Sequence, residues 1–444
     1  MTLFGRPRSP TPAQQAIPST RSFDSTFALL AEGYRFITRR CDLFGSDIFS
    51  TRLMLRKAIC VRGEEAARMF YQPGRFSRRH AIPPTTLMLL QDYGSAQLLD
   101  GEAHRKRKAM LMSLQEPAGR QRLVELFEAE WRARFARWQQ VPRVVLHHEA
   151  EAALCAVACR WAGVPVSDAD LAQRTAEFSA MIEGAGSAGP RNWKGLFMRR
   201  GTERWARALI DAVRESRAEP PPQSALAVIA WHREADGKLI SRGDAAVELI
   251  NMLRPTVAVA RFIVFGALAL HEFPEYRPRL AAGGDAWLTM FAQEVRRYYP
   301  FFATIGGRAS RDFDWRGLHF EKGAWVLLDV FGTNRHPALW GDPDTFRPER
   351  FERWQSSGYD LVAQGGGDYY SGHRCAAEMA TVDLLKTALR LLATAVDYRV
   401  PPQDLRVSLS RMPTLPASGF VIDSVRTAPD RHAAAASQPQ APPV

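Results

Sequence analysis

A glycine-rich segment that ends in a single cysteine is the feature that most constrains this chain. Residues 364–375 read Gln-Gly-Gly-Gly-Asp-Tyr-Tyr-Ser-Gly-His-Arg-Cys, and an apolar run with helical spacing extends from Ala376 to about residue 396. Glycines permit positive φ angles and let a backbone lie against a flat partner without Cβ clashes. The amides at the N-terminus of the helix that follows would favour the thiolate form of Cys375. A thiolate beside a planar surface suits an axial haem ligand, although a buried, inert cysteine explains these residues equally well.

Two motifs upstream of this loop favour a haem ligand over an inert cysteine. Glu294 and Arg297 are three residues apart and share one helix face, where they can also hold a third partner, Arg350, from the segment Phe-Arg-Pro-Glu-Arg-Phe at 346–351. Alone, such a pair is usually a solvated surface ion pair. In the order Glu-x-x-Arg, Pro-Glu-Arg-Phe and glycine-rich loop with cysteine, the chain resembles the cytochrome P450 superfamily from about residue 44 to residue 426.

This resemblance implies a mainly α fold with small peripheral β-sheets, the cytochrome P450 fold. It also implies a haem b whose iron is bound by the Cys375 thiolate. Glu294, Arg297 and Arg350 would be structural residues that lock the segment supporting the haem loop.

The length of 444 residues allows two or three domains, but no linker or internal repeat divides the chain. We therefore expect a single haem domain over residues 21–426. Residues 1–20 and 427–444 lack apolar periodicity and are expected to be disordered tails. The expected helices are 63–72, 102–115, 119–137, 147–162, 169–184, 201–217, 244–271, 286–299 and 376–396. The expected strands are 46–61, 304–312, 317–328 and 396–422.

The sequence gives no sign of a secretory leader or of a membrane span. Its longest apolar segment, 256–270, contains Arg261 and is shorter than a span requires, so a buried core helix is expected. The resemblance then implies a cytoplasmic protein with no membrane anchor. Five scattered cysteines do not form a disulfide framework. Cys155 and Cys159 lie one helical turn apart, where core packing is favoured over a metal pair.

The formal net charge of +12 and the basic run at 104–108 raise the possibility of nucleic-acid binding. No nucleic-acid motif accompanies them, so a solvated basic face is expected, with no nucleic-acid partner. The resemblance gives part of this run a role. His104 and Lys108 match positions that hold the haem propionates, and Arg374 is placed with them as a cofactor-binding residue.

The centre of the long helix expected at 244–271 reads Asn-Met-Leu-Arg-Pro-Thr at 251–256. Pro255 lacks an amide proton, which leaves the carbonyl of Asn251 without its usual partner. Arg254 brings a permanent charge into an apolar stretch and needs an anionic partner, either a carboxylate of the protein or one of a substrate. Most P450s carry an acid–alcohol pair here. Arg-Pro in its place resembles the fatty-acid peroxygenase branch, as do segments 247–259, 293–301 and 364–367 and the five-residue spacer at 368–372.

That branch implies hydroxylation of a carboxylic acid at Cα or Cβ with hydrogen peroxide and without a redox partner protein. Arg254 would bind the substrate carboxylate, which replaces the missing acid–base group, and Pro255 is placed with it in the catalytic set. Gln97 is the third predicted catalytic and substrate-binding residue. Glutamine is common there in hydroxylases and histidine occurs in the best-known olefin-forming relative, so hydroxylation is favoured. A passive polar residue in the pocket is the alternative.

Further substrate-binding residues follow from the resemblance. Relatives carry phenylalanines along the alkyl channel where this chain has Gln91, Ala185 and Thr304, while Phe301 remains. The expected channel is therefore wider and more polar, which suits a fatty acid or a bulkier, functionalised acid. Ala377 also replaces a glycine that is usual in P450s.

Three other functions are alternatives to the peroxygenase hypothesis. They are oxidative decarboxylation of the same acids to terminal alkenes, a dioxygen- and reductase-dependent monooxygenase, and a haem-bound carrier or sensor without turnover.

Overall fold

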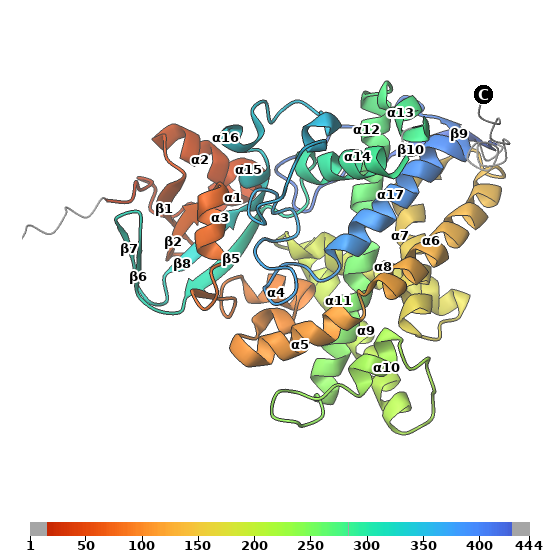
Figure 1. Ribbon diagram of the computed structural model, residues 1–444, viewed down its shortest axis with the longest axis horizontal. Helices are drawn as coiled ribbons and strands as arrows, with labels where there is room; N and C mark the ends of the chain where they lie inside the picture. The colour runs from red at the N-terminus through yellow and green to blue at the C-terminus, as the bar shows by residue number, and fades with distance from the viewer. Residues whose placement is uncertain (1–15, 283, 429–444) are drawn as a thin grey trace, which may run out of the picture.

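The computed structural model describes residues 16–282 and 284–428, and most of them are helical. The largest sheet lies at one end of the molecule, shown at the left of Figure 1, and the long helices fill the other end together with a smaller three-stranded sheet. This arrangement is the mainly α fold with small peripheral sheets that the sequence predicts. The α-helices are α1 Thr26–Glu32, α2 Phe36–Phe44, α3 Glu64–Phe70, α4 Pro84–Leu90, α5 Gly101–Ser113, α6 Pro117–Trp138, α7 Leu146–Ala162, α8 Asp168–Ala185, α9 Pro190–Arg214, α10 Ala225–Ala230, α11 Arg242–Ala258, α12 Ala260–Glu272, α13 Tyr276–Ala282, α14 Gly284–Tyr298, α15 Val330–Asn334, α16 Pro337–Trp340 and α17 Glu378–Thr394.

Three small sheets accompany the helices. The largest has the order β1-β2-β8-β5-β3, in which β2 and β8 run parallel and the other neighbours antiparallel. The strands are β1 Ile48–Leu53, β2 Arg56–Val61, β3 Phe76–Ser77, β4 Val144–Val145, β5 Thr304–Ala309, β6 Phe313–Trp315, β7 Leu318–Phe320, β8 Trp325–Asp329, β9 Val396–Arg399 and β10 Val421–Thr427. Short 3₁₀ turns occupy Gly33–Arg35 (η1), Ala96–Leu98 (η2) and Pro348–Phe351 (η3).

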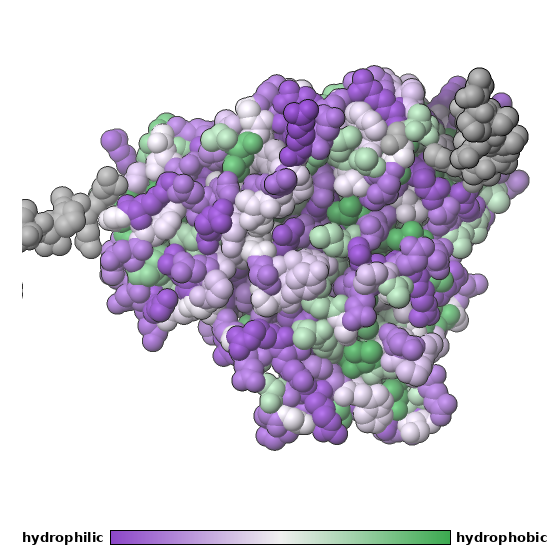
Figure 2. Space-filling model, in the orientation of Figure 1, coloured by the Kyte–Doolittle hydropathy of each residue, from purple (hydrophilic) through white to green (hydrophobic). Residues whose placement is uncertain are grey.

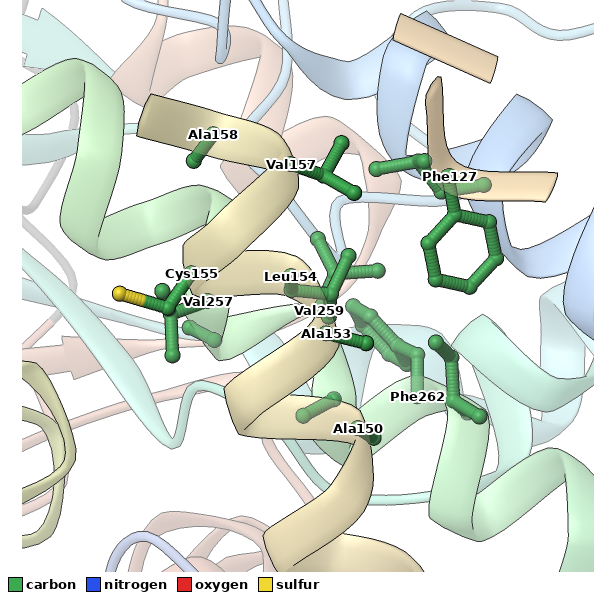
Figure 3. Packing of buried hydrophobic residues seen from close by; sticks show 14 of the residues in the cluster. Phe127, Ala150, Ala153, Leu154, Cys155, Val157, Ala158, Val257, Val259 and Phe262 are labelled. Atoms are coloured by element: carbon green, nitrogen blue, oxygen red, sulfur yellow. The ribbon is translucent and has the colours of Figure 1, made fainter. Parts of the chain in front are cut away.

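Helix α7 lies at the centre of the main core because small residues cover most of its surface. Its alanines and cysteines let α11 and α12 pack closely, and Figure 3 shows Cys155 of α7 and Val257 of α11 in the same buried cluster. Cys155 and Cys159 are both fully buried in this core. Among the described residues, no group of His, Cys, Asp and Glu side chains could hold a metal ion. Cys155 and Cys159 are members of the main hydrophobic cluster, which is the core packing that the sequence favours.

The long helix predicted at 244–271 is divided into α11 and α12. The break falls at Val259, whose amide donates to the Thr256 carbonyl at 3.2 Å, and Pro255 lies inside α11 one turn earlier. Together the two helices form the one described stretch, Arg242–Glu272, whose length and composition would allow a membrane crossing. However, 89% of its most apolar window is buried inside the molecule. It is thus the central core helix that the sequence predicts.

Several predicted boundaries change. Helix α9 begins at Pro190 rather than 201, and the strand predicted at 46–61 is a hairpin of β1 and β2. The end of the predicted N-terminal tail pairs with β1, since the Ser50 amide donates to the Pro18 carbonyl at 2.7 Å. At the other end, Ala428 donates to Ala395 at 3.0 Å. The described residues of both predicted tails thus contact the domain, and the rest of the tails, 1–15 and 429–444, lie outside the described residues.

Candidate active site

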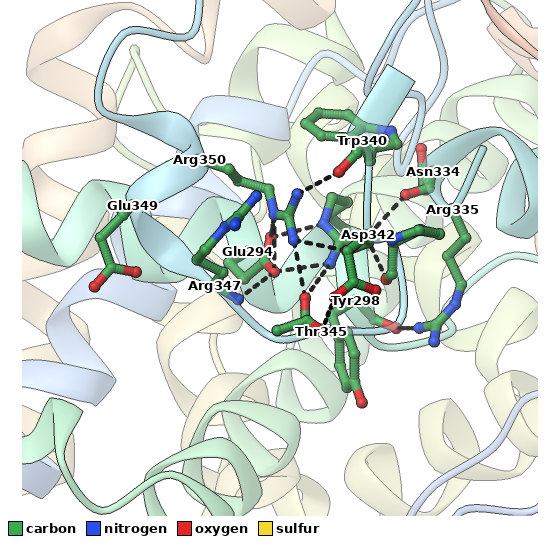
Figure 4. A network of polar contacts seen from close by, with 12 residues as sticks. Glu294, Tyr298, Asn334, Arg335, Trp340, Asp342, Thr345, Arg347, Glu349 and Arg350 are labelled. Carbon is green, nitrogen blue, oxygen red and sulfur yellow. Dashed lines mark hydrogen bonds and ion pairs between the residues drawn. The ribbon is translucent and has the colours of Figure 1, made fainter. Parts of the chain in front are cut away.

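The buried ion-pair network around Glu294 joins α14 to the segment before the cysteine loop. Arg297 donates from Nε and Nη2 to both Glu294 carboxylate oxygens, each at 2.7 Å, and Arg350 donates to the same carboxylate at 3.2 Å. Figure 4 shows Arg350 and Glu294 converging, and Arg350 also donates to the Trp340 carbonyl at 2.7 Å. Glu294 and Arg297 are almost fully buried, so the network is internal and not a solvated surface pair.

A short chain of hydrogen bonds connects this network to the cysteine loop. Arg297 donates to the Asn334 backbone carbonyl at 3.3 Å, and the Asn334 side chain accepts from the Val362 amide at 2.8 Å. The Val362 carbonyl in turn accepts from the Gly365 amide at 3.0 Å. The three residues predicted to be structural thus lie where they can hold the loop in place.

Cys375 lies just before α17, which begins at Glu378. Its amide donates to the Gln364 carbonyl at 3.0 Å, and the Gln364 side chain lies 3.8 Å from the Cys375 sulfur and 3.0 Å from the Thr381 hydroxyl. The loop closes tightly on itself and on Tyr71. A Cβ added at Gly366 would lie 2.9 Å from the Gly358 carbonyl oxygen and 3.1 Å from the Tyr71 ring. Glycine is needed here for close packing within the protein.

The charge state of Cys375 is set by opposing influences. Burial raises the pKa of the Cys375 thiol, and the amide of Ala377 and the charges of Lys108 and Arg296 act in the opposite direction. The amide of Ala377 thus favours the thiolate as the sequence predicts, but in the protein by itself burial outweighs this effect. Because a bound metal cation deprotonates a coordinating thiol outright, iron binding would supply the missing stabilisation.

Four basic side chains, of which three are buried and His373 is half-buried, gather between α5 and the cysteine loop. The rings of His104 and His373 lie 4.0 Å apart, and Arg78 and Lys108 are both more than nine-tenths buried. Burial, together with neighbouring cations, lowers the pKa of His104 to about 4 and that of His373 to about 2. Such a surplus of desolvated donors fits the two carboxylates of haem. The cysteine and this basic cluster therefore both suit a haem group.

The structure extends the predicted cofactor set. Lys108 donates from Nζ to the Arg374 carbonyl, while the Arg374 guanidinium pairs with Glu378 at 2.5 Å. Glu378 is shared with the buried Arg296, so the charge of Arg374 is already compensated. Arg78 and His373 were not predicted. No spacing in the sequence relates Arg78 to the residues around it in space.

Arg254 is a buried cation that forms no ion pair with a carboxylate in the described part of the chain. Its side chain is 6% exposed, one Nη atom donates to the Leu90 carbonyl, and its Nε atom has no hydrogen-bond partner. Within 16–282 and 284–428, no Asp or Glu oxygen is recorded in an ion pair with it. Burial lowers the pKa of Arg254 to about 9, so the side chain still carries its charge at neutral pH. Of the two predicted partners, the protein carboxylate is not found among the described residues.

One face of α11 holds the segment that precedes Gln97. Glu248 accepts from the Ala96 amide at 2.6 Å, Asn251 donates to the Gln91 carbonyl at 2.8 Å, and Arg254 reaches Leu90. Arg107 completes the attachment by donating to Glu248 and to the Gly94 carbonyl, each at 2.9 Å. Glu248 and Arg107 were not predicted from the sequence.

The remaining predicted substrate residues lie on several elements. The Gln97 side-chain oxygen is buried without a partner, and Ala185 is 4% exposed at the end of α8. Phe301 stacks on Phe262 with ring centroids 4.5 Å apart, and Thr304 opens β5. Among the described residues, Gln97, Asn251 and Arg254 each have a buried polar atom without a hydrogen-bond partner.

Comparison with known proteins agrees with this geometry. The cytochrome P450 family description matches residues 286–364. Cytochrome P450 3A15 of Cavia porcellus is 35% identical over 128 residues, which make up 28% of this chain and 25% of that protein. The match thus spans a quarter of the length of this curated relative.

Solved structures match over nearly the whole chain. Cytochrome P450SP alpha (CYP152B1) in complex with (R)-ibuprophen is 42% identical with a TM-score of 0.89, covering 91% of this chain and 99% of that one. Cytochrome P450EX alpha (CYP152N1) with myristic acid is 38% identical with a TM-score of 0.90, covering 93% and 100%. A variant of cytochrome P450 OleT in complex with arachidonic acid is 34% identical with a TM-score of 0.91, covering 94% and 100%.

This chain therefore belongs to the cytochrome P450 family of haem-thiolate oxidoreductases. Its structural relatives place it more narrowly, in the CYP152 group of fatty-acid peroxygenases that its Arg-Pro motif resembles.

Proposed function

We propose that this protein uses hydrogen peroxide to hydroxylate a carboxylic acid at Cα or Cβ, with Arg254 as the anchor for the acid. The observation that carries the proposal is the buried guanidinium of Arg254, which has an unpartnered Nε and no recorded ion pair among the described residues. A buried cation of this kind is stabilised when an anion enters its site, because desolvation is then offset by charge-assisted hydrogen bonds.

Cys375 would bind the haem iron, and the basic cluster would bind the haem propionates. This cluster consists of Arg78, His104, Lys108 and His373. When bound, it supplies the oxidising chemistry that consumes peroxide and removes hydrogen from carbon. The protein binds and orients the acid. This role depends on α11 and on the segment from Leu90 to Ala96 that is hydrogen-bonded to it.

Arg254 is itself oriented by the Leu90 carbonyl. This leaves Nε free to donate to a substrate carboxylate. Fixing the carboxylate there would leave only Cα and Cβ of the acid within reach of the haem. The same carboxylate would occupy the position of the missing protein acid. It can move a proton between the two oxygens of hydrogen peroxide. Because hydrogen peroxide is already reduced by two electrons relative to dioxygen, no redox partner protein is required.

The class of acid follows from the channel residues. Gln91, Ala185 and Thr304 offer less apolar area than aromatic side chains, whereas Phe301 keeps one aromatic wall by stacking on Phe262. We propose a fatty acid or a bulkier, functionalised acid. Relatives have been solved with myristic acid and with (R)-ibuprophen, one linear and one branched. We expect the protein to act in the cytoplasm.

The test is a mass-spectrometric screen of linear and aryl-substituted acids with purified protein and hydrogen peroxide. A hydroxy acid formed without NAD(P)H or a reductase supports the proposal. Terminal alkenes as the main product would select decarboxylation, and products only with NAD(P)H and a reductase would select the monooxygenase. A spectral shift on adding the acid with no product under any condition would leave a carrier or sensor.

A further inference from the structure

The β1–β2 hairpin ends in a turn with unusual residues. Met54 and Leu55 are its two central residues, with φ angles of 51° and 62°, and their side chains are 45% and 69% exposed. Positive φ at both central positions is typical of a type I′ turn, for which Asn-Gly and Asp-Gly are preferred. A large apolar side chain at positive φ is strained, and strained positions that persist are concentrated at functional sites. Folding alone does not explain this pair.

The start of α1 adds two exposed aromatic side chains beside the turn. Phe23 is 74% exposed and Phe27 is 86% exposed. The Met54 amide donates to the Thr26 hydroxyl at 2.6 Å, and the Leu55 amide donates to the Asp24 carboxylate at 2.7 Å. These bonds fasten the two segments together. Phe23, Phe27, Met54 and Leu55 thus form one fixed surface, named here the apolar tip.

Basic side chains surround the apolar tip. Arg52 lies over the Phe23 ring with its guanidinium carbon 5.6 Å from the centroid, and Arg56 and Lys57 follow the turn directly. Arg21 precedes Phe23, and all four basic residues are exposed. The carboxylate of Asp24 already accepts the Thr26 and Leu55 amides. Figure 2 shows apolar and hydrophilic surface interspersed at this strand-bearing end of the molecule.

We infer that the apolar tip docks the protein onto a membrane surface that contains anionic lipids. Exposed aromatic and aliphatic side chains ringed by Arg and Lys match such a surface, where apolar groups enter the interface and cations approach lipid phosphates. The protein's net charge of +12 supports the same partner. This contact is peripheral and differs from a membrane span.

The apolar tip also has a structural connection to the proposed substrate channel. Helix α1 leads through Gly33 into Tyr34, whose hydroxyl donates to the Phe301 carbonyl at 2.8 Å. An apolar acid dissolved in the membrane would therefore meet the protein on the element that supports one channel wall. This delivery of an acid from the membrane rests on the proposed function, whereas the docking of the apolar tip onto the membrane does not.

The test is co-sedimentation of the holoenzyme with vesicles of phosphatidylcholine, alone or in an equal mixture with phosphatidylglycerol. The test variant carries Met54→Asn and Leu55→Gly, which are the residues such a turn prefers, so it should melt at a higher temperature than wild type. We expect wild type to bind the mixed vesicles about ten-fold more tightly than phosphatidylcholine alone, less so at high salt. The variant should lose at least about ten-fold of this binding. Trp231→Ser, which removes a 53% exposed aromatic residue after α10, should bind like wild type.

Three results would overturn the inference. Wild type that stays in the supernatant with both kinds of vesicle would do so, as would a test variant that binds like wild type. A dimer in light scattering that forms through the apolar tip, with no vesicle binding, would assign this surface to a second copy of the chain. Because the readout is binding, failure here leaves the oxidation of acids by peroxide untouched, and the two proposals fail separately.

Discussion

Glu248 accepts a hydrogen bond from the backbone amide of Ala96 at 2.6 Å, which fastens α11 to the turn that carries Gln97. Arg254 lies six residues further along the same helix and holds Leu90 at the other end of that segment. The proposed anchor of the substrate acid and the residue proposed to influence its fate are therefore positioned by one helix.

Replacing Glu248 tests this attachment. Glu248→Ala leaves the buried Arg107 without one of its two carboxylate partners, and breaking such a pair costs about 3–5 kcal/mol. Glu248→Gln keeps an acceptor for the Ala96 amide and should lose less. Urea unfolding measures the stability, and the ratio of Cα to Cβ products reports the position of the segment. An unchanged product ratio in a folded Glu248→Ala enzyme would contradict the positioning role.

Removing Arg254 should separate activity from stability. Arg254→Ala deletes the proposed partner of the substrate carboxylate. The loss of a buried charge partner costs about 2–5 kcal/mol of binding free energy, so kcat/KM should fall roughly 30- to several thousand-fold. The melting temperature should stay the same or rise, because a buried cation without an ion pair disfavours folding. Arg254→Lys keeps the charge and should retain part of the activity. Full turnover of the alanine variant, at normal haem content, would refute the anchor.

The network around Glu294 predicts a loss of haem. Glu294→Ala leaves Arg297 and Arg350 buried without their carboxylate and should cost about 3–5 kcal/mol. The loop that carries Cys375 would then be held less firmly, so haem bound per chain should fall. Glu349→Ala is the matched control. Its side chain is 36% exposed and pairs with an exposed arginine, a contact worth about 0–1 kcal/mol.

Asp329 predicts a pH-dependent stability. Its carboxyl is fully buried and accepts from the Gly332 amide at 2.7 Å and the Thr38 hydroxyl at 2.8 Å. Burial raises the pKa of Asp329 to about 6, so the folded protein binds this proton more tightly than the unfolded chain. The stability it contributes is present below about pH 4 and is lost as the pH rises through about 6.

Asp329→Asn keeps a neutral side chain of the same shape. Relative to wild type, it should therefore gain stability on the order of 2 kcal/mol between about pH 4 and pH 8. Urea unfolding at both pH values measures the difference. A difference that stays constant over this range would argue against the raised pKa.

Gln97 predicts the balance between the two products. Gln97→His should raise the share of terminal alkene over hydroxy acid, because it places the residue of the olefin-forming relative beside the substrate. The product ratio by mass spectrometry measures this, with Gln97→Asn as the control that retains an amide. An unchanged ratio of alkene to hydroxy acid would indicate that Gln97 is a polar residue of the pocket wall without influence on the reaction.

The sequence by itself determined the parts that local spacing encodes. Glu294 and Arg297 share a helix face because they are three residues apart, and Arg254 lies in an apolar helical stretch that a charge enters only with an anion to meet it. The glycine-rich loop ending in Cys375 is likewise a contiguous pattern. These features sufficed to predict the fold class, the family and the cysteine that would bind the haem iron.

Only the tertiary structure decided which distant residues meet and how strongly water is excluded from them. Arg78 and His373 are almost 300 residues apart along the chain, and no periodicity brings them together. The same is true of Glu248 and Ala96. Burial outweighs the expected effect of the helix on Cys375, because desolvation depends on every element packed around a group. The exposure of the strained Met54–Leu55 turn beside Phe27 was decided in the same way, by contacts between segments that the sequence does not relate.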